Sequence, residues 1–143
     1  MAITWGIVVI VLSVLAWGGQ TISWFASPTA ERLSLTEAEA DVEPAFYADI
    51  RGEALWDTLT LWVLIVAGAL LIAGNSAWSY FGLSGGGIYL YFAGRGLLTR
   101  RAMQQRGLRV GSAQNLKSAY LFLTVWGAMG LVTLVAAVVE LAS

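Results

Sequence analysis

The sequence predicts an all-α integral membrane protein: a single domain over residues 1–143, built as a four-helix bundle with a short helical cap on its cytoplasmic side. The chain is 58% hydrophobic and only 12% charged, whereas soluble domains have roughly 25% charged residues. Its apolar residues form four blocks of about 20 residues, the length that crosses the hydrocarbon core of a bilayer. A backbone in lipid must satisfy its own hydrogen bonds, so these blocks are expected to be helices. They are residues 2–25, 55–73, 77–98 and 119–141.

The first block is expected to be a true membrane span and not a cleaved signal. It has no positively charged n-region, runs beyond the usual length of an h-region, and has no small-x-small cleavage site near Ala26.

The connection 26–54 is acidic and is expected to be partly helical. Ser27 suits the cap and Pro28 the first position of a short helix. Thr36 and Glu39 fit a capping box, and Pro44 permits a new helix that runs on into the second span. The alternative, a mobile acidic loop, stays open. A calcium loop is not predicted, because the segment DVEPAFYAD lacks the oxygen-ligand spacing and the central glycine of such loops.

The segment GNS at residues 74–76 predicts a tight hairpin turn between the second and third spans. Gly74 suits the end of one helix and Ser76 the cap of the next. These two spans should therefore be antiparallel neighbours, which places the connections 26–54 and 99–118 together on the other side of the membrane.

Charge predicts the orientation. Eight acids and two bases lie from Glu31 to Asp57, and six bases and no acid lie from Arg95 to Lys117. Lys and Arg near span ends mark the cytoplasmic side, so both connections are expected in the cytoplasm and both termini outside. A high ratio of Arg to Lys, together with many Ala, Gly and Leu residues, indicates a bacterial source and hence the plasma (inner) membrane.

The connection 99–118 is basic. The third span is expected to continue as helix to Arg106, with Gly107 as its stop and Ser112 as the cap of the fourth span. Two interpretations of the bases stay open: they bind anionic lipid headgroups, or they set the topology and pair with the acidic connection. The residues concerned are Arg100, Arg101, Arg106, Arg109 and Lys117.

The third span is rich in glycine, and Gly82 and Gly86 form a GxxxG pair. Small residues at this spacing let helix backbones approach closely, so both glycines are expected at a helix–helix contact. A hinge or a glycine-lined passage is the alternative.

The polar candidate site is an ion pair within the membrane. Asp57 lies just inside the second span, Glu53 lies one turn before it, and Arg95 lies at similar depth near the end of the third span. A charged group in the membrane is costly alone and tolerable when paired, so Asp57 and Arg95 are expected to meet. Tyr91 and Gln20 lie at the same level and complete the candidate site. Separate snorkelling of each charge to water stays open.

Composition argues against several kinds of chemistry. With no Cys and no His, disulfides and thiolate or imidazole metal sites are excluded, and the sequence has no nucleophile–base pair and no phosphate-binding loop. We therefore expect no enzyme activity, no cofactor, no metal and no nucleic-acid partner.

The layout resembles the small DoxX-like bacterial membrane proteins: four short spans, an SP-containing loop after the first (Ser27, Pro28), a tight hairpin between the second and third, and an Arg-rich end to the third. The resemblance implies a four-helix bundle in the plasma membrane. Small multidrug transporters are less similar, because residues 2–25 hold no membrane-embedded Glu.

Two classes of function follow. The first is a non-catalytic accessory or structural subunit that packs in a larger membrane complex or with copies of itself. The second is a small-solute or lipid transporter with a cytoplasm-facing site at Asp57 and Arg95.

Overall fold

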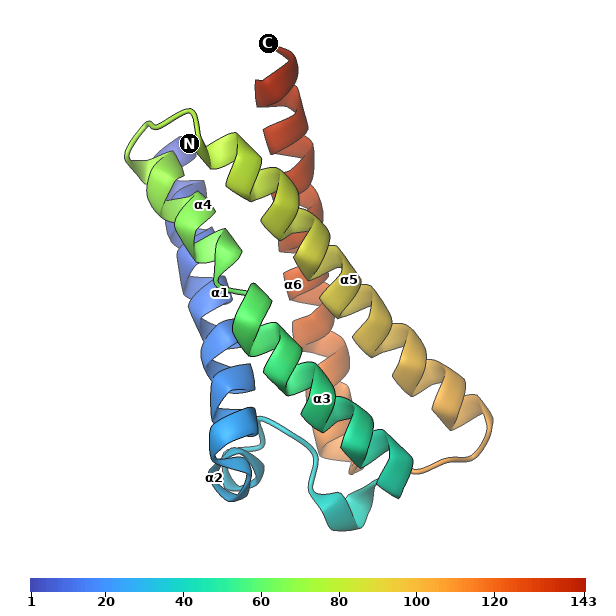
Figure 1. The fold of residues 1–143 in the computed structure, drawn as a ribbon. Coiled ribbons are helices and arrows are strands. Elements are labelled where there is room, and N and C mark those ends of the chain that lie inside the picture. Colours follow the sequence, from blue (N-terminus) through green and yellow to red (C-terminus); the bar gives the residue numbers. More distant parts are fainter.

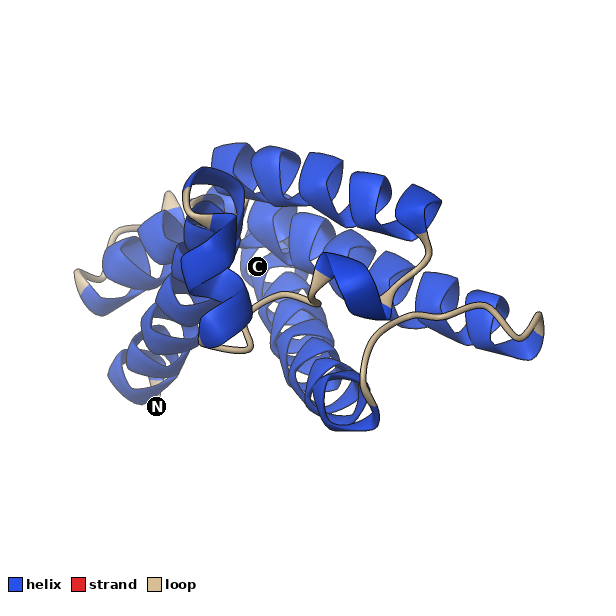
Figure 2. Ribbon diagram, turned by 90° about the horizontal axis from the view of Figure 1, so that it is seen from below, coloured by secondary structure: helices blue, strands red, loops and turns tan.

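The computed structural model describes all residues 1–143, and the chain is helical with no strand (Figure 2). Two short elements follow the first long helix: α2 (Ser27–Arg32) and a 3₁₀ turn, η1 (Glu39–Asp41). The five longer helices are α1 (Ala2–Phe25), α3 (Pro44–Thr60), α4 (Val63–Ile72), α5 (Trp78–Gln105) and α6 (Ala113–Ala142).

Three helical segments are long and apolar enough to cross a membrane: Ala2–Phe25, Pro44–Ile72 and Ala113–Ala142. The prediction of an all-helical chain is thereby confirmed, and three of the four predicted spans lie in segments apolar enough to cross a membrane. The 28-residue helix α5 is not among the three. Its six glycines, two serines and three tyrosines lower its mean hydropathy, so the fourth predicted span remains a proposal.

The long helices run between two ends of the molecule (Figure 1). Both termini and the turn between α4 and α5 lie at one end, which we call the hairpin end. The two long connections lie together at the other, the loop end, as predicted. The most extensive contact is between α5 and α6. On the other side of the bundle α1 packs along α3 and α4, and contact of α4 with α5 joins these three helices to α5 and α6.

The second span is broken between Thr60 and Val63, a feature that the sequence did not predict. Side chains donate hydrogen bonds to backbone carbonyls around this break. Trp17 Nε1 lies 2.8 Å from the carbonyl of Thr58, and the Tyr89 hydroxyl lies 3.4 Å from the carbonyl of Leu61. Neighbouring side chains thus satisfy backbone groups at the break, as a chain in lipid would require.

Glycines allow the closest helix contacts. A Cβ at Gly86 would lie 2.8 Å from the carbonyl oxygen of Gly130, and one at Gly82 would lie 3.3 Å from Ala137. Both glycines therefore face α6. Gly6 of α1 and Gly68 of α4 form a second close approach, since a Cβ on either would meet the other's carbonyl oxygen at 3.0 Å or less.

Some of the residues predicted at the helix ends have the predicted role in the structure, and others do not. Gly74 and Gly107 have φ of 66° and 70° just past their helices, and the Ser112 hydroxyl accepts a hydrogen bond from the amide of Asn115. The cap predicted at Ser76 is wrong, because the Asn75 side chain accepts the bond from the Ala77 amide instead.

The cap predicted at Ser27 is wrong as well, because α2 begins at Ser27 itself, after Ala26, with no side-chain cap. The predicted capping box of Thr36 and Glu39 is also wrong. Glu39 begins the turn η1 after Ala38, with no side-chain cap. Glu37, between the two predicted members, is drawn into a buried contact instead.

Candidate functional site

Arg95 on α5 holds two carboxylates of α3. Its Nη2 lies 2.6 Å from Asp49 Oδ1, and its Nη1 lies 2.8 Å from Glu53 Oε1. The expected pairing of Arg95 with Asp57 is therefore wrong: the guanidinium binds the two carboxylates nearer the loop end. Asp49 and Glu53 lie one turn apart on the same face of α3, so one guanidinium reaches both, and Asp57 lies a further turn from the loop end.

Asp57 is buried without a partner. It is 3% exposed, and its Oδ2 has no hydrogen-bond donor within reach in the chain. Its main-chain carbonyl accepts the amide of Leu61, at the break of the second span. A carboxyl group in this position is costly to ionise, because a buried charge needs a counter-charge or several donors.

Other polar groups lie around the break. Ser13 of α1 is fully buried and its hydroxyl has no partner. The hydroxyl of Tyr89, which is also fully buried, lies 3.3 Å from the Ser13 carbonyl. Asp57 and Ser13 thus both lie near the break with unused hydrogen-bonding capacity.

The other predicted members of the site do not join this group. Tyr91 lies on the outward face of α5 and is 65% exposed. Gln20 is half-buried on α1, and its side chain makes no hydrogen bond within the chain.

At the loop end the basic and acidic connections are paired at two points. Arg100 donates to Glu37 through Nε and Nη2, at 3.2 and 2.8 Å, and both side chains are buried. Arg109 bonds to Glu43 and to the Ala40 carbonyl. Arg101, Arg106 and Lys117 are exposed and have no carboxylate within ion-pair distance.

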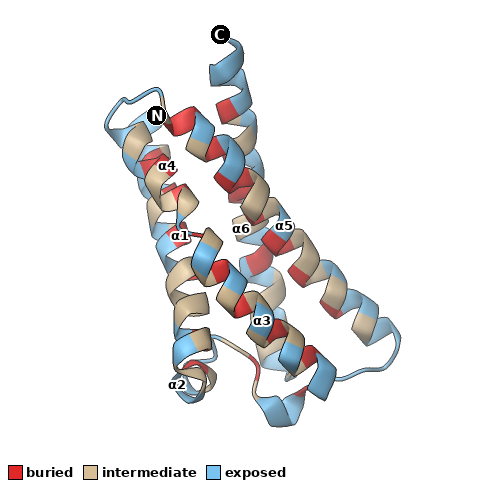
Figure 3. Cartoon of the chain, viewed as in Figure 1, coloured by how far each residue is buried: buried red, intermediate tan, exposed pale blue.

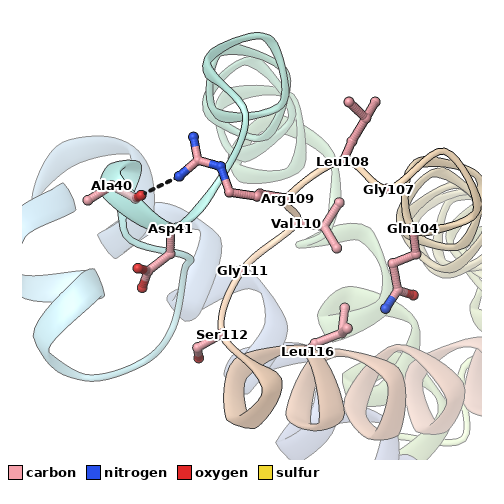
Figure 4. A pocket seen from close by; sticks show the side chains of 10 residues that line it. All are labelled: Ala40, Asp41, Gln104, Gly107, Leu108, Arg109, Val110, Gly111, Ser112 and Leu116. Carbon is pink, nitrogen blue, oxygen red and sulfur yellow. Dashed lines mark hydrogen bonds between the residues drawn. The ribbon is translucent and has the colours of Figure 1, made fainter.

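A surface hollow of about 450 Å³ lies between these connections (Figure 4). Asp41 and Arg109 contribute opposite charges to its wall, and Arg109 is already bound to the Ala40 carbonyl. The polar groups of the hollow do not form a set that would bind one kind of ligand.

The outward face of α5 differs from that of α6, because it carries hydroxyl groups and glycines instead of mostly Val and Leu. Alternating buried and exposed residues run along α5 in Figure 3. We call a line of residues along this face, at helical spacing, the outward stripe. Tyr80, Ser84, Tyr91 and Leu98 of the stripe are exposed, and Gly87 and Gly94 are half-buried. A Cβ at either glycine would touch nothing within 4 Å.

Sequence reasoning missed four contributors to these sites. Asp49 lies four residues before Glu53, a spacing that would have identified it as a neighbour on the same helix face. Arg51 donates to the carbonyls of Ser23 and Trp24 at the end of α1. The burial of Glu37 and Ser13 could not be predicted from the sequence, because it depends on how distant segments pack.

Comparison of the chain with protein families, with curated proteins and with solved structures finds no match. The class that the structure shows is an all-helical protein with three helical segments long and apolar enough to cross a membrane. The resemblance to DoxX-like proteins stays a prediction.

Proposed function

We propose that the chain is a non-catalytic accessory subunit of a larger complex in a bacterial plasma membrane. In this proposal four segments cross the membrane, with the loop end in the cytoplasm and both termini outside. Residues 78–94 of α5 carry no charge, and α5 packs between α4 and α6, each part of a segment apolar enough to span. The six bases from Arg95 to Lys117 support the orientation.

The outward stripe of α5 is the observation that carries the accessory role. Lipid tails offer no hydrogen bonds, and small residues on a membrane helix are typical of helix–helix contacts. Gly87 and Gly94 leave room for a second backbone to approach. By contrast, the outward residues of α6 are mostly Val and Leu, which suit lipid. We infer that a transmembrane helix of a partner subunit covers the stripe.

Cysteine crosslinking tests this role directly, because the protein has no native Cys. Gly87→Cys places a thiol in the stripe, where the added side chain meets no neighbour. Val132→Cys on α6 is the matched control, since it is exposed and the contact of Gly86 with Gly130 places it at similar depth.

In native membranes, a bifunctional reagent should link Gly87→Cys to one partner protein and leave Val132→Cys unlinked. Equal crosslinking at both positions would contradict a specific interface. A product that contains only two copies of this chain would replace the accessory role with a homo-oligomer.

Anionic lipids are proposed as additional partners at the loop end. Arg101, Arg106 and Lys117 are exposed and not neutralised by carboxylates. Each base near a negatively charged membrane surface contributes about 1 kcal/mol. Exchange of all three for Gln should weaken binding of phosphatidylglycerol in native mass spectrometry, whereas exchange of Arg32 alone, in the acidic connection, should not.

A second candidate is a small-solute or lipid transporter, favoured by the unpartnered polar side chains at a break in a membrane helix. Discontinuous helices often form binding sites near the middle of transporters. Transport requires access to the site from both sides. Ser13→Cys that reacts with an impermeant thiol reagent from both faces of a vesicle would support the transporter; protection from both faces would support the accessory subunit.

A further inference from the structure

We propose that Asp57 is a proton-binding site inside the bundle, reached from the loop end along a line of three carboxyl groups on α3. This inference goes beyond the accessory role and holds whether or not a partner covers α5.

The line consists of Asp49, Glu53 and Asp57. Residues four apart on a helix lie on one face, about 6 Å apart along the axis. Exposure falls steadily along this line: the side chain of Asp49 is 39% exposed, that of Glu53 is 14% exposed, and Asp57 is 3% exposed. The three carboxyl groups therefore lead from the solvated loop end into the interior.

The surroundings of Asp57 favour its neutral form. Its Oδ2 has no donor, and the nearest cation, Arg95, is engaged by Asp49 and Glu53. An ionised Asp57 would lack a partner and would lie one turn from the negative Glu53. Carboxyl groups inside membrane proteins are typical of proton relays. The step is simple: the Asp57 carboxylate takes a proton to form the carboxylic acid, and on release the proton passes to Glu53 or to water.

The charged and titratable groups around Asp57 are few. Glu53 lies on its own helix, and α5 contributes Arg95 and Tyr89. Residues 2–25 of α1, 63–72 of α4 and 121–139 of α6 contain no titratable side chain. No three acidic residues converge to hold a metal ion, and cation sites require several oxygen ligands. The proton is therefore the ligand that the site suits.

Access is from one side only. Towards the hairpin end, the interior beside Asp57 is filled by Leu61, Leu64 and Tyr89, all fully buried. The site should therefore respond to the pH of the compartment at the loop end and not to that on the hairpin side.

Carbon-13 NMR of the whole protein in lipid nanodiscs tests the protonation state. The chain has only three aspartates, Asp41, Asp49 and Asp57, so protein labelled at the aspartate carboxyl carbon gives three signals. At neutral pH one signal should have the shift of a neutral acid, should vanish in Asp57→Asn, and should move to the carboxylate shift as the pH rises. Should Asp57→Asn fail to fold, Asp41→Asn and Asp49→Asn assign the signal by elimination. Three carboxylate shifts at neutral pH would overturn the proposal.

The rate at which Asp57 loses its proton tests whether the three carboxyl groups form a proton path. After a rapid rise in pH, time-resolved infrared absorption follows the loss of the Asp57 carbonyl band. Glu53→Gln should slow this loss several-fold, while Glu140→Gln at the hairpin end should leave it unchanged. An unchanged rate in Glu53→Gln would remove Glu53 from the path.

Discussion

Arg95 and Glu53 join two helices whose backbones otherwise touch little: Nη1 of Arg95 lies 2.8 Å from Oε1 of Glu53, and α3 has only a slight contact with α5. The same guanidinium holds Asp49. One arginine therefore holds α3 against α5 near the loop end. Asp57 lies deeper in the bundle and has no counter-charge.

A double-mutant cycle measures this connection. Arg95→Gln and Glu53→Gln should each lower the free energy of unfolding in detergent, and the double variant should lose less than the sum. Groups in direct contact show coupling of about 0.5–3 kcal/mol. The cycle of Arg95→Gln with Asp57→Asn is the control and should be additive within about 0.5 kcal/mol. A larger coupling to Asp57 than to Glu53 would restore the pair expected from the sequence.

The glycine contacts of α5 give a second prediction. A methyl group at Gly86 would clash with the backbone of Gly130 and Leu134, whereas one at Gly87 meets nothing within 4 Å. Gly86→Ala should therefore destabilise by about 1–3 kcal/mol through overpacking. Gly87→Ala should be neutral or stabilise by up to about 1 kcal/mol, because Ala favours helix over Gly. Thermal unfolding in one detergent compares the two. Equal effects would mean that α5 and α6 do not approach as described.

The buried ion pair of Arg100 and Glu37 at the loop end gives a third prediction. Removal of one partner from a buried ion pair costs about 3–5 kcal/mol, so Glu37→Gln should release the acidic connection from α5. Hydrogen exchange of residues 33–43 should then accelerate. Glu39→Gln, two residues away and exposed without an ion pair, should change stability by no more than about 0.5 kcal/mol. Unchanged exchange in Glu37→Gln would show that the connection is held by other contacts, such as that of Val42 with Val110.

The proposed orientation in the membrane gives a fourth prediction. Ser76 and Ser112 are exposed at opposite ends of the molecule, and each can carry the only thiol of the chain. In intact cells an impermeant reagent should label Ser76→Cys and not Ser112→Cys, because the bases of the loop end favour the cytoplasm. The reverse labelling would invert the orientation.

The helices and their order could be predicted from the sequence, because long apolar blocks in lipid have few alternatives to helix. Gly107 and Ser112 likewise act locally, so their roles at the ends of α5 and α6 were predictable. The break after Thr60 was not, because the side chains that bond to carbonyls beside it, Trp17 and Tyr89, reach it from other helices.

The candidate site was predicted less well for a similar reason. The sequence placed Asp57, Glu53 and Arg95 near one another, but the choice among the acids depends on where α3 meets α5. Asp49, outside the apolar block, was overlooked although its spacing to Glu53 was visible. The burial of Glu37 against Arg100 could not be read from an acidic loop, since it arises from the packing of Val42, Phe46, Ile50 and Val110 into a small core.

Native mass spectrometry of the protein, extracted in mild detergent from its own membrane, tests the accessory role most directly. We expect a stoichiometric complex in which this 15.3 kDa chain accompanies a different membrane protein. A bulky residue in the stripe, Gly87→Trp, should abolish the complex, and Val132→Trp on α6 should leave it intact. A wild-type chain that is found alone, or only in multiples of its own mass, would contradict the accessory role.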